Sequence, residues 1–280
     1  MITHPNVKIN LGLNILRKRE DGFHDLETLF VPCHDISDTL EIVVGDDYSR
    51  TSAAIFGKYA PEMISQGISE DGKLMITIAR AEGVDWNPLK DLTAKAYGIL
   101  SEDFDMPPVK IFLEKTSPVG AGLGGGSADA AFALKMLNEL CSLDLTEQQL
   151  ASYAARLGSD CAFFVYNRPM IGEGRGEVLT EYDVDLKGYD LQVLAPEGIA
   201  VSTKDAYGGI RPHLPEVPLR DALAFPVEQW PETLVNDFED TVFAKYPELA
   251  AIKRSLYDSG AVYASMSGSG SALFAIYRRD

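Results

Sequence analysis

The stretch SPVGAGLGGGSADAAFALKMLNEL, residues 117–140, places five glycines within seven positions and then continues as an apolar, alanine-rich run. Ala and Leu dominate residues 127–140, and neither Pro nor Gly interrupts them, so a helix is predicted there. Unpaired N–H groups and the positive end of the helix dipole meet at a helix start. Because glycines also let the backbone approach a ligand closely, the stretch is predicted to hold phosphate groups.

Other interpretations of these glycines fit less well. A flexible connection between strand and helix remains possible, but five glycines cost folding entropy that a linker does not require. A Walker A loop needs Lys where Gly126 stands. The dinucleotide fingerprint matches at Gly120, Gly122 and Gly125, but Pro118 separates it from its strand and the next run leads to another helix. An NAD-binding oxidoreductase is therefore disfavoured, and the signatures of a protein kinase are lacking.

The composition predicts a soluble globular protein of one large domain or two smaller ones. The chain has 280 residues, of which 46% are hydrophobic and 24% charged. Its 25 basic and 42 acidic residues give a net charge of −17 (25 − 42). We expect neither nucleic acid nor an anionic membrane as a partner, because both require clustered Lys and Arg. A small phosphate ligand can still bind through backbone N–H groups.

The cysteines and the first residues predict a cytoplasmic setting. Cys33, Cys141 and Cys161 are far apart and odd in number, which argues against a disulfide framework and against a zinc site. A reducing compartment fits this pattern. The opening MITHPNVKINLGL lacks the features of a signal peptide, and no apolar run approaches the length of a membrane span.

Strands and helices are mixed without strict alternation, which predicts an α+β fold. Residues 7–16 alternate as a half-buried strand, residues 20–22 form a turn, and residues 46–90 are polar and irregular. Further strands are expected at residues 23–33, 38–44, 109–115 and 189–196, and two more joined by a turn within 262–279. Helices are expected at residues 91–100, 127–140, 146–158 and 247–260, and residues 201–210 read as a loop leading into a helix.

Several motifs together resemble the GHMP kinases, a family of small-molecule kinases. PVGAGLGGGSADAA is similar to the family's central signature, and PNVKINLGLNI, LGSDCAFF and SMSGSGSALFAIY follow the family's order over nearly the whole chain. The resemblance implies a two-domain α+β fold. The N-terminal domain, residues 1–166, would be ribosomal protein S5 domain 2-like. The C-terminal domain, residues 167–280, would be a ferredoxin-like α/β sandwich, with the active site in the cleft.

Two details narrow the resemblance to members whose substrate carries cytidine diphosphate. These are KREDGFHDLETLF and the triple glycine of the loop. They imply ATP-dependent phosphorylation, with Mg²⁺, of the 2-hydroxyl of 4-diphosphocytidyl-2-C-methyl-D-erythritol, in the non-mevalonate route to isoprenoid precursors. A monomer or weak homodimer is expected. The alternatives are another GHMP kinase, of homoserine, sugar or mevalonate type, and a non-catalytic homologue that binds a ligand.

The resemblance assigns the catalytic roles to Lys8 and Asp160. From its neighbours alone, Asp160 reads more readily as the cap of the next helix. In the family, the matching Asp takes the proton from the acceptor hydroxyl, and a Lys at the position of Lys8 lies beside it. Such an ammonium would keep the carboxylate ionised and stabilise charge on the phosphoryl oxygens.

The resemblance also assigns the nucleotide contacts, and no residue is assigned to a metal. Lys115 would meet the ATP phosphates, although a lysine at a strand end is more often solvated. Asp91 stands where the family often has Asn, which puts its nucleotide contact in doubt. Ser127 would donate to a phosphate or simply cap the helix. The residues expected to wrap the phosphates are Pro118, Val119, Gly120, Ala121, Gly122, Leu123, Gly124, Gly125, Gly126, Ser127 and Ala128.

The cytosine would be recognised by two rings and two polar side chains. By resemblance, Phe23 and Tyr207 sandwich the base, while His24 and Asn10 make polar contacts. The usual first aromatic residue is Tyr, so Phe23 is a departure, and core packing is the alternative for each ring. The SGSGS segment at 267–271 is either a plain hairpin turn or a neighbour of the phosphates.

Overall fold

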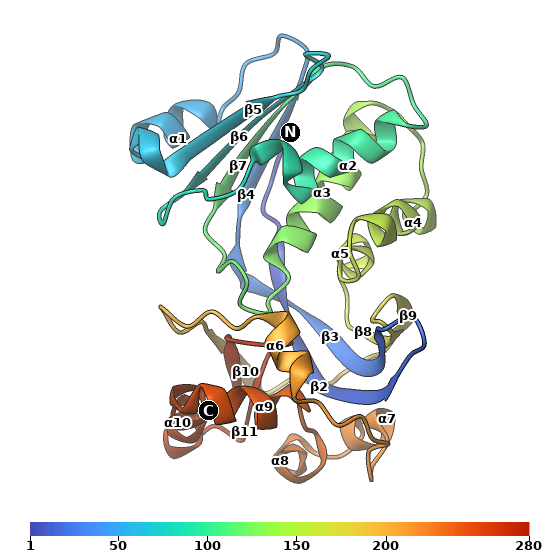
Figure 1. The fold of residues 1–280 in the computed structure, drawn as a ribbon, viewed down its shortest axis with the longest axis vertical. Coiled ribbons are helices and arrows are strands. Elements are labelled where there is room, and N and C mark those ends of the chain that lie inside the picture. Colours follow the sequence, from blue (N-terminus) through green and yellow to red (C-terminus); the bar gives the residue numbers. More distant parts are fainter. Residues whose placement is uncertain (280) are drawn as a thin grey trace. The chain divides into compact units, whose positions relative to one another are not determined.

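The computed structural model describes residues 1–279, which divide into two compact units. Unit 1 contains residues 1–7, 33–119 and 124–167. Unit 2 contains residues 8–32 and 120–123 and continues from Arg168 onward. Each unit combines sheet and helix, which confirms the predicted α+β fold (Figure 1).

Unit 1 is built on a five-stranded sheet with the order β1-β4-β7-β6-β5. β6 and β7 run parallel, and the other neighbours run antiparallel. The strands are β1 (Ile2–Thr3), β4 (Thr39–Val44), β5 (Ile64–Ile68), β6 (Leu74–Arg80) and β7 (Val109–Lys115).

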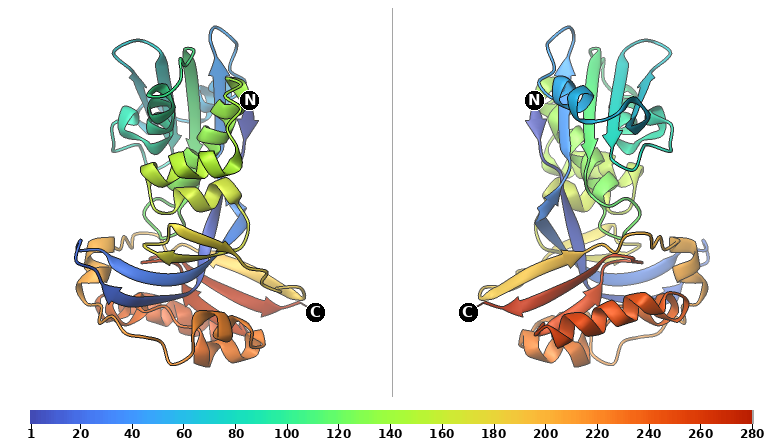
Figure 2. Two further views of the ribbon diagram at one scale, coloured as in Figure 1. Left: turned by 90° about the vertical axis from the view of Figure 1, so that its right-hand side faces the viewer. Right: turned by 90° about the vertical axis from the view of Figure 1, so that its left-hand side faces the viewer.

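Helices cover both faces of this sheet (Figure 2). Phe112 of β7 packs against Ile55 and Tyr59, at α1 (Ser52–Lys58) and directly after it. Neighbouring side chains of a strand point to opposite faces, so Lys115 projects from the other face. The helices of unit 1 on that side are α2 (Leu92–Ser101), α3 (Gly125–Leu140), α4 (Glu147–Leu157) and α5 (Cys161–Tyr166). Unit 1 also contains two short 3₁₀ helices, η1 (Pro61–Met63) and η2 (Pro88–Lys90).

Unit 2 contains two sheets, with the orders β2-β3-β8-β9 and β10-β12-β11. The first holds β2 (Asn6–Lys18), β3 (His24–Ser37), β8 (Met170–Gly174) and β9 (Val178–Glu181), and β2 and β3 each extend into unit 1. The second holds β10 (Tyr189–Leu194), β11 (Tyr263–Met266) and β12 (Leu273–Arg278).

The helices of unit 2 are short except for the last. α10 buries Leu249 and Leu256 against the second sheet, in one core with Met266 and Leu273 (Figure 2). The helices are α6 (Thr203–Gly208), α7 (Leu219–Leu223), α8 (Trp230–Thr233), α9 (Phe238–Lys245) and α10 (Pro247–Asp258), with the 3₁₀ helix η3 (Val227–Gln229).

Most predicted elements are confirmed, and two predictions are corrected. Residues 46–90 are not irregular, since they form α1, β5 and β6 with two short 3₁₀ helices. β2 is not half buried, because Lys8, Asn10 and Asn14 on its polar face are each 3–4% exposed. These side chains are bonded inside unit 2, so the alternation of polar and apolar residues did not mark a solvated face.

Candidate active site

The middle of the glycine loop, residues 120–123, packs within unit 2 against the segment 267–271. A Cβ atom on Gly122, whose φ is +78°, would lie 2.2 Å from the carbonyl oxygen of Ser267. Only glycine allows this approach. Ala272 donates its N–H to the carbonyl of Ala121 at 3.0 Å. The segment 267–271 is indeed the connection of the β11–β12 hairpin, and it also supports the loop.

Lys8 is a buried cation at the same place. Its Nζ donates to Oδ1 of Asn10 at 2.5 Å and to the carbonyl of Gly122 at 2.8 Å. Its backbone N–H donates to the carbonyl of Leu123 at 2.9 Å, and its Nζ lies 5.5 Å from the centre of the Phe30 ring. A solvated strand lysine would have none of these contacts, so the burial of Lys8 points to a specific task.

Asn10 is turned toward Lys8 by its own partners. Its Oδ1 also accepts from Oγ of Ser267 at 3.4 Å, and its Nδ2 donates to Oγ1 of Thr28 at 3.1 Å. Thr28 in turn donates to the carbonyl of Gly12 at 2.5 Å. Asn10, expected to contact the cytosine, is therefore engaged within the protein. Sequence reasoning missed Thr28, because a threonine inside a strand gives no signal of its own.

The end of the loop, in unit 1, opens α3. Gly124 occupies the N-cap position with φ of +74° and provides no capping side chain. Its carbonyl accepts the first helical bond, from the N–H of Ala128 at 2.9 Å. A Cβ atom on Gly126 would meet no atom within 4 Å. The first N–H groups of α3, from Gly125 to Ser127, thus open a 16-residue helix whose N-cap residue offers no side chain to accept from them.

Lys115 lies in a buried polar cluster rather than in solvent. Its Nζ donates to Oδ2 of Asp38, to Oδ2 of Asp129 at 2.7 Å and to Oγ of Ser117 at 2.9 Å. These three acceptors match the three hydrogens of an ammonium, so no hydrogen is left over for the predicted contact with phosphate. The cluster touches the helix start, because a Cβ atom on Gly125 would lie 2.4 Å from Oγ of Ser117.

Asp160 immediately precedes α5, at its N-cap position. Its side chain makes no capping hydrogen bond, so the structure does not use it as a plain helix cap. The next residue, Cys161, is fully buried, and its thiol contacts Ser127. Burial raises the pKa of that thiol to about 12, which keeps it protonated and unreactive.

Asp91 is the cap of α2. Its Oδ1 accepts from the N–H of Thr93 at 2.9 Å and from the Thr93 hydroxyl at 2.7 Å. Its Oδ2 accepts from Nε1 of Trp86 at 3.0 Å. Both carboxylate oxygens accept hydrogen bonds, and an amide at this position could accept with one oxygen only.

Unit 1 also contains a hollow of about 400 Å³ beside the end of β7. Thr116 and Lys115, just upstream of the glycine loop, form one side of it. Tyr59, Met63 and Ala81 contribute apolar surface. The charged residues Lys58 and Glu82 complete the lining, so the wall mixes apolar and polar groups.

In unit 2, two of the four residues proposed for the cytosine meet each other. His24 and Tyr207 stack with ring centres 4.8 Å apart and planes inclined by 23°. Tyr207 also meets the ring of Phe238 edge to face at 4.8 Å. Phe23 is 54% exposed, and the guanidinium of Arg175 lies 5.0 Å from its ring centre. Phe23 is therefore an accessible aromatic surface rather than a core side chain.

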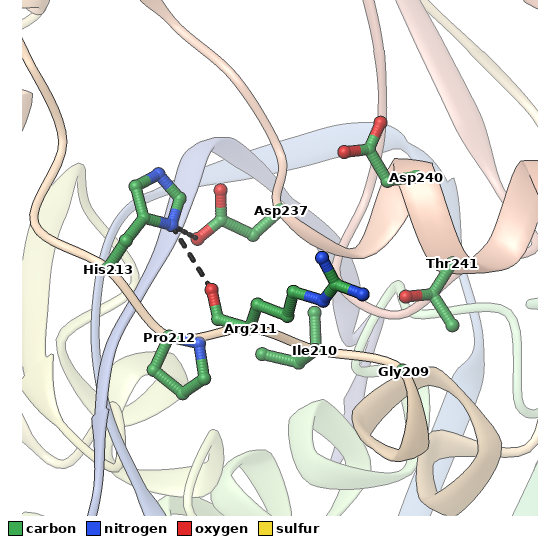
Figure 3. A pocket seen from close by; sticks show the side chains of 8 residues that line it. All are labelled: Gly209, Ile210, Arg211, Pro212, His213, Asp237, Asp240 and Thr241. Atoms are coloured by element: carbon green, nitrogen blue, oxygen red, sulfur yellow. Dashed lines mark hydrogen bonds and ion pairs between the residues drawn. The ribbon is translucent and has the colours of Figure 1, made fainter.

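Unit 2 contains a hollow of about 630 Å³ (Figure 3). Residues 209–213, which directly follow α6 in the sequence, form one side of it. Nδ1 of His213 lies 3.9 Å from Oδ2 of Asp237 and 3.4 Å from the carbonyl of Arg211. Arg211 and Asp240 line the same hollow. Both contacts are made by His213, which belongs to the segment that follows Tyr207 in the sequence.

Within residues 1–279, no three His, Cys, Asp or Glu side chains gather as a metal site would require. Over the same residues, no helix combines the length and the apolar character needed to cross a membrane. The cysteines described are free thiols.

Comparison with known proteins identifies the family of this chain. Residues 91–168 match the model of the GHMP kinases N terminal domain, and residues 228–280 match that of the GHMP kinases C terminal domain. The chain belongs to the GHMP kinase family, and it is an ATP-dependent small-molecule kinase.

Its relatives define a narrower class. A protein of Bacteroides thetaiotaomicron is 46% identical over 100% of this chain and 93% of its own length, and one of Bacteroides fragilis is 45% identical over 99% and 92%. Both are named 4-diphosphocytidyl-2-C-methyl-D-erythritol kinase. A crystal structure of 4-(cytidine 5'-diphospho)-2C-methyl-D-erythritol kinase aligns with a TM-score of 0.73 at 29% identity, covering 98% of this chain and 89% of that one.

Proposed function

We propose that this kinase transfers the γ-phosphoryl group of ATP to the 2-hydroxyl of 4-diphosphocytidyl-2-C-methyl-D-erythritol, in the non-mevalonate route to isoprenoid precursors. The observation that carries the proposal is identity of 45–46% to relatives of that name over 99–100% of the chain. The exposed Phe23 next to a paired His24 and Tyr207 supports it from the side of the substrate.

The triphosphate of ATP would bind at residues 118–128. The support is the uncapped start of α3, with open space in front of Gly126. Backbone N–H groups at a helix start favour negative charge. We place the purine in the hollow of about 400 Å³ at Thr116, since this residue leads directly into the loop. For Lys115, whose hydrogens are used within the protein, we propose a supporting role in place of a direct phosphate contact.

Mg²⁺ would arrive with the nucleotide. In kinases this ion keeps several waters and is bound chiefly by substrate phosphates with few protein ligands. The residues at the loop fit such an ion, because a Cβ atom on Gly120 or on Gly126 would meet nothing within 4 Å and the space there is open. When bound, Mg²⁺ supplies neutralisation of the phosphate charge.

The transfer needs an oriented hydroxyl and a stabilised phosphoryl group. The acceptor oxygen attacks the γ-phosphorus, the bond to the β,γ-bridging oxygen breaks, and ADP leaves with that electron pair. We assign the proton of the hydroxyl to the carboxylate of Asp160, because this residue stands where the family has the Asp that takes this proton. We assign charge stabilisation to Lys8, which Asn10 and Gly122 hold in place.

The cytosine would stack on Phe23 and Tyr207 and bond to His24. Burial, and then the charge of Lys18, lowers the pKa of His24, which is therefore a neutral imidazole with one donor and one acceptor at neutral pH. A cytosine edge offers matching groups, including the N4 donor. For Asn10 we propose that it positions Lys8, since its amide is already engaged there.

We also propose the remaining properties that the sequence indicates. The two domains would divide near residues 166–167, and the last segment of unit 1, which ends at residue 167, supports this division. The free thiols suit a reducing cytoplasm. A monomer or weak homodimer is our expectation, which sedimentation over a range of concentrations would test.

One experiment tests the proposed activity. The protein is incubated with ATP, Mg²⁺ and a panel of alcohols that includes the cytidylyl compound, homoserine, mevalonate and galactose, and ADP is measured. We expect ADP with the cytidylyl compound alone. Release of ADP with another alcohol, or with none of them, would contradict the proposal.

Two variants separate the assigned roles. Asp160→Asn is expected to abolish turnover while ATP binding stays measurable, and near-normal turnover would end the assignment.

His24→Ala is expected to raise KM for the cytidylyl substrate far more than KM for ATP. Equal effects on both values would remove His24 from the cytosine site.

A further inference from the structure

Four buried polar side chains of unit 1 join the two ends of the glycine loop. Asp38, Lys115, Ser117 and Asp129 are between 0 and 6% exposed. Lys115 and Ser117 belong to the chain that enters the loop, whereas Asp129 lies on α3, one turn after Gly125, in the chain that leaves it. The cluster therefore fastens the end of β7 to the start of α3.

Asp38 is the fully satisfied carboxylate of the cluster. Its Oδ1 accepts from the N–H groups of Thr116 and Ser117 at 2.6 and 2.7 Å. Its Oδ2 accepts from the Ser117 hydroxyl at 2.6 Å and from Nζ of Lys115. Four donors stabilise the ionised form, so Asp38 and Lys115 make a neutral pair.

Asp129 is the second carboxyl on the same ammonium, and it has far fewer partners. Its Oδ2 accepts from Lys115 at 2.7 Å, while its Oδ1 is buried without any hydrogen-bond partner. If Asp129 were ionised, two carboxylates and one ammonium would leave an uncompensated negative charge in the interior. Such a charge is costly, and two neighbouring carboxyls avoid it by keeping one proton.

We propose that Asp129 is a positioning residue that holds the two ends of the loop together as an uncharged carboxylic acid. It places no negative charge beneath the helix start that receives the triphosphate, so the cluster supports the loop without repelling its ligand. This benefit rests on the proposed function, whereas the charge state of Asp129 does not.

The groups around Asp129 act in the same sense. Burial raises the pKa of Asp129 well above its ordinary value, against the lowering effect of Lys115, and the charges of Asp38 and Asp91 raise it further. Burial alone would also raise the pKa of Asp38, but Lys115 and the bonded donors outweigh it and the pKa is lowered. The pKa values of the two carboxyls are thus shifted in opposite directions, and the proton remains with Asp129.

The first test compares the wild type with Asp129→Asn, which replaces the acid by a neutral group of the same shape. An acid that stays protonated in the folded state but ionises in the unfolded chain stabilises the protein less as pH rises above about 4. The unfolding constant of the wild type, divided by that of Asp129→Asn, should then rise about tenfold for each pH unit between pH 5 and 7.

A ratio that does not change with pH would overturn the proposal. Glu114→Gln is the matched control, because Glu114 lies next to Lys115 on β7 but is paired with the exposed Lys58 on the opposite face. The unfolding constant of the wild type, divided by that of Glu114→Gln, should stay constant over the same pH range. If Asp129→Asn does not fold, the carboxyl carbon of Asp129 is followed by NMR in the wild type, and an ionised signal at pH 7 would contradict the proposal.

The second test measures ATP binding directly by calorimetry, so that it does not depend on the acceptor. Asp129→Asn should keep the Kd for ATP within about threefold, whereas Asp129→Leu, which cannot bond to Lys115, should raise it about tenfold or more. Equal Kd values for the two variants would remove the positioning role. Failure of the wild type to bind ATP would instead contradict the proposed function, and it would leave the charge state to the first test.

Discussion

Two helices of unit 1 begin in opposite ways. α4 is closed by its own side chains, since Thr146 accepts from the N–H of Gln149 and the Gln149 side chain accepts from the N–H of Thr146. Its first turn also carries the acidic Glu147. α3 begins after Gly124, with neither a capping side chain nor an acid in its first turn.

The difference separates a helix start that serves stability from one that serves a ligand. A capping box satisfies two N–H groups and stabilises the helix without further help. The start of α3 forgoes that stability, and a buried polar cluster beneath it holds the backbone instead. We infer that the N–H groups of α3 are kept for phosphate oxygens.

The largest expected effect comes from giving α3 the acid that α4 already has. Gly126→Glu should stabilise the helix slightly, because an acid in the first turn suits the dipole and Glu is a better helix former than Gly. It should also repel the triphosphate and raise the Kd for ATP about 100-fold or more, since like charges cost several kcal/mol. Calorimetry with ATP and thermal unfolding measure the two effects.

A loss of ATP binding that came with a loss of stability would not count as support, because misfolding would explain both. Replacing Glu147 of α4 by Gln provides the control. It removes an acid from a helix start of the same unit, and it should leave ATP binding unchanged. Normal ATP affinity in Gly126→Glu would contradict the comparison.

Gly125→Ala tests the contact between the loop and the buried cluster. Its Cβ atom would lie 2.4 Å from Oγ of Ser117 and 2.9 Å from Nζ of Lys115, so one of them must move. We expect a loss of about 1–3 kcal/mol in the free energy of unfolding, as in other overpacked sites. Urea titration measures it, and an unchanged midpoint would show that the cluster does not pack against the helix start.

Gly126→Ala is the paired change, one residue further, where a Cβ atom meets nothing within 4 Å. The protein should gain up to about 1 kcal/mol of stability, because Ala favours the helix. The methyl group would occupy space that a phosphate needs, and we expect a rise of about tenfold in KM for ATP. An unchanged KM would mean that the phosphates stay clear of Gly126.

Thr146→Ala should have the smallest effect and only on stability. Loss of the cap on α4 is expected to cost about 1 kcal/mol in the free energy of unfolding. Steady-state kinetics should give kcat and KM for ATP equal to those of the wild type. A clear rise in KM for ATP would remove the distinction between the two helix starts.

The amino-acid sequence predicted these two helices well for different reasons. The capping of α4 is local, because Thr146 and Gln149 are three residues apart and meet whenever the helix forms. The glycines of the loop also stood out locally. Lys8 and Asp160 could be named only through resemblance to a family, since neither carries a distinctive neighbourhood.

What the sequence did not predict depends on contacts between distant residues. The burial of Lys115 follows from Asp38, which is 77 positions away and looks like an ordinary residue at the start of a strand. Asn236 holds the segment 267–271 by donating to the carbonyls of Met266 and Gly268 at 2.7 and 2.9 Å, and nothing near it in the sequence announces this. The prediction that residues 46–90 are irregular was wrong, because their apolar residues are scattered along the sequence. They form a core only when β6 pairs with β7.

The central claim is that the backbone at the start of α3 binds the triphosphate of ATP. A crystal structure of the protein with a non-hydrolysable ATP analogue and Mg²⁺ tests it most directly. We predict phosphate oxygens within about 2.7–3.2 Å of backbone nitrogens between Gly124 and Ser127. An analogue bound with its phosphates away from these residues would contradict the account.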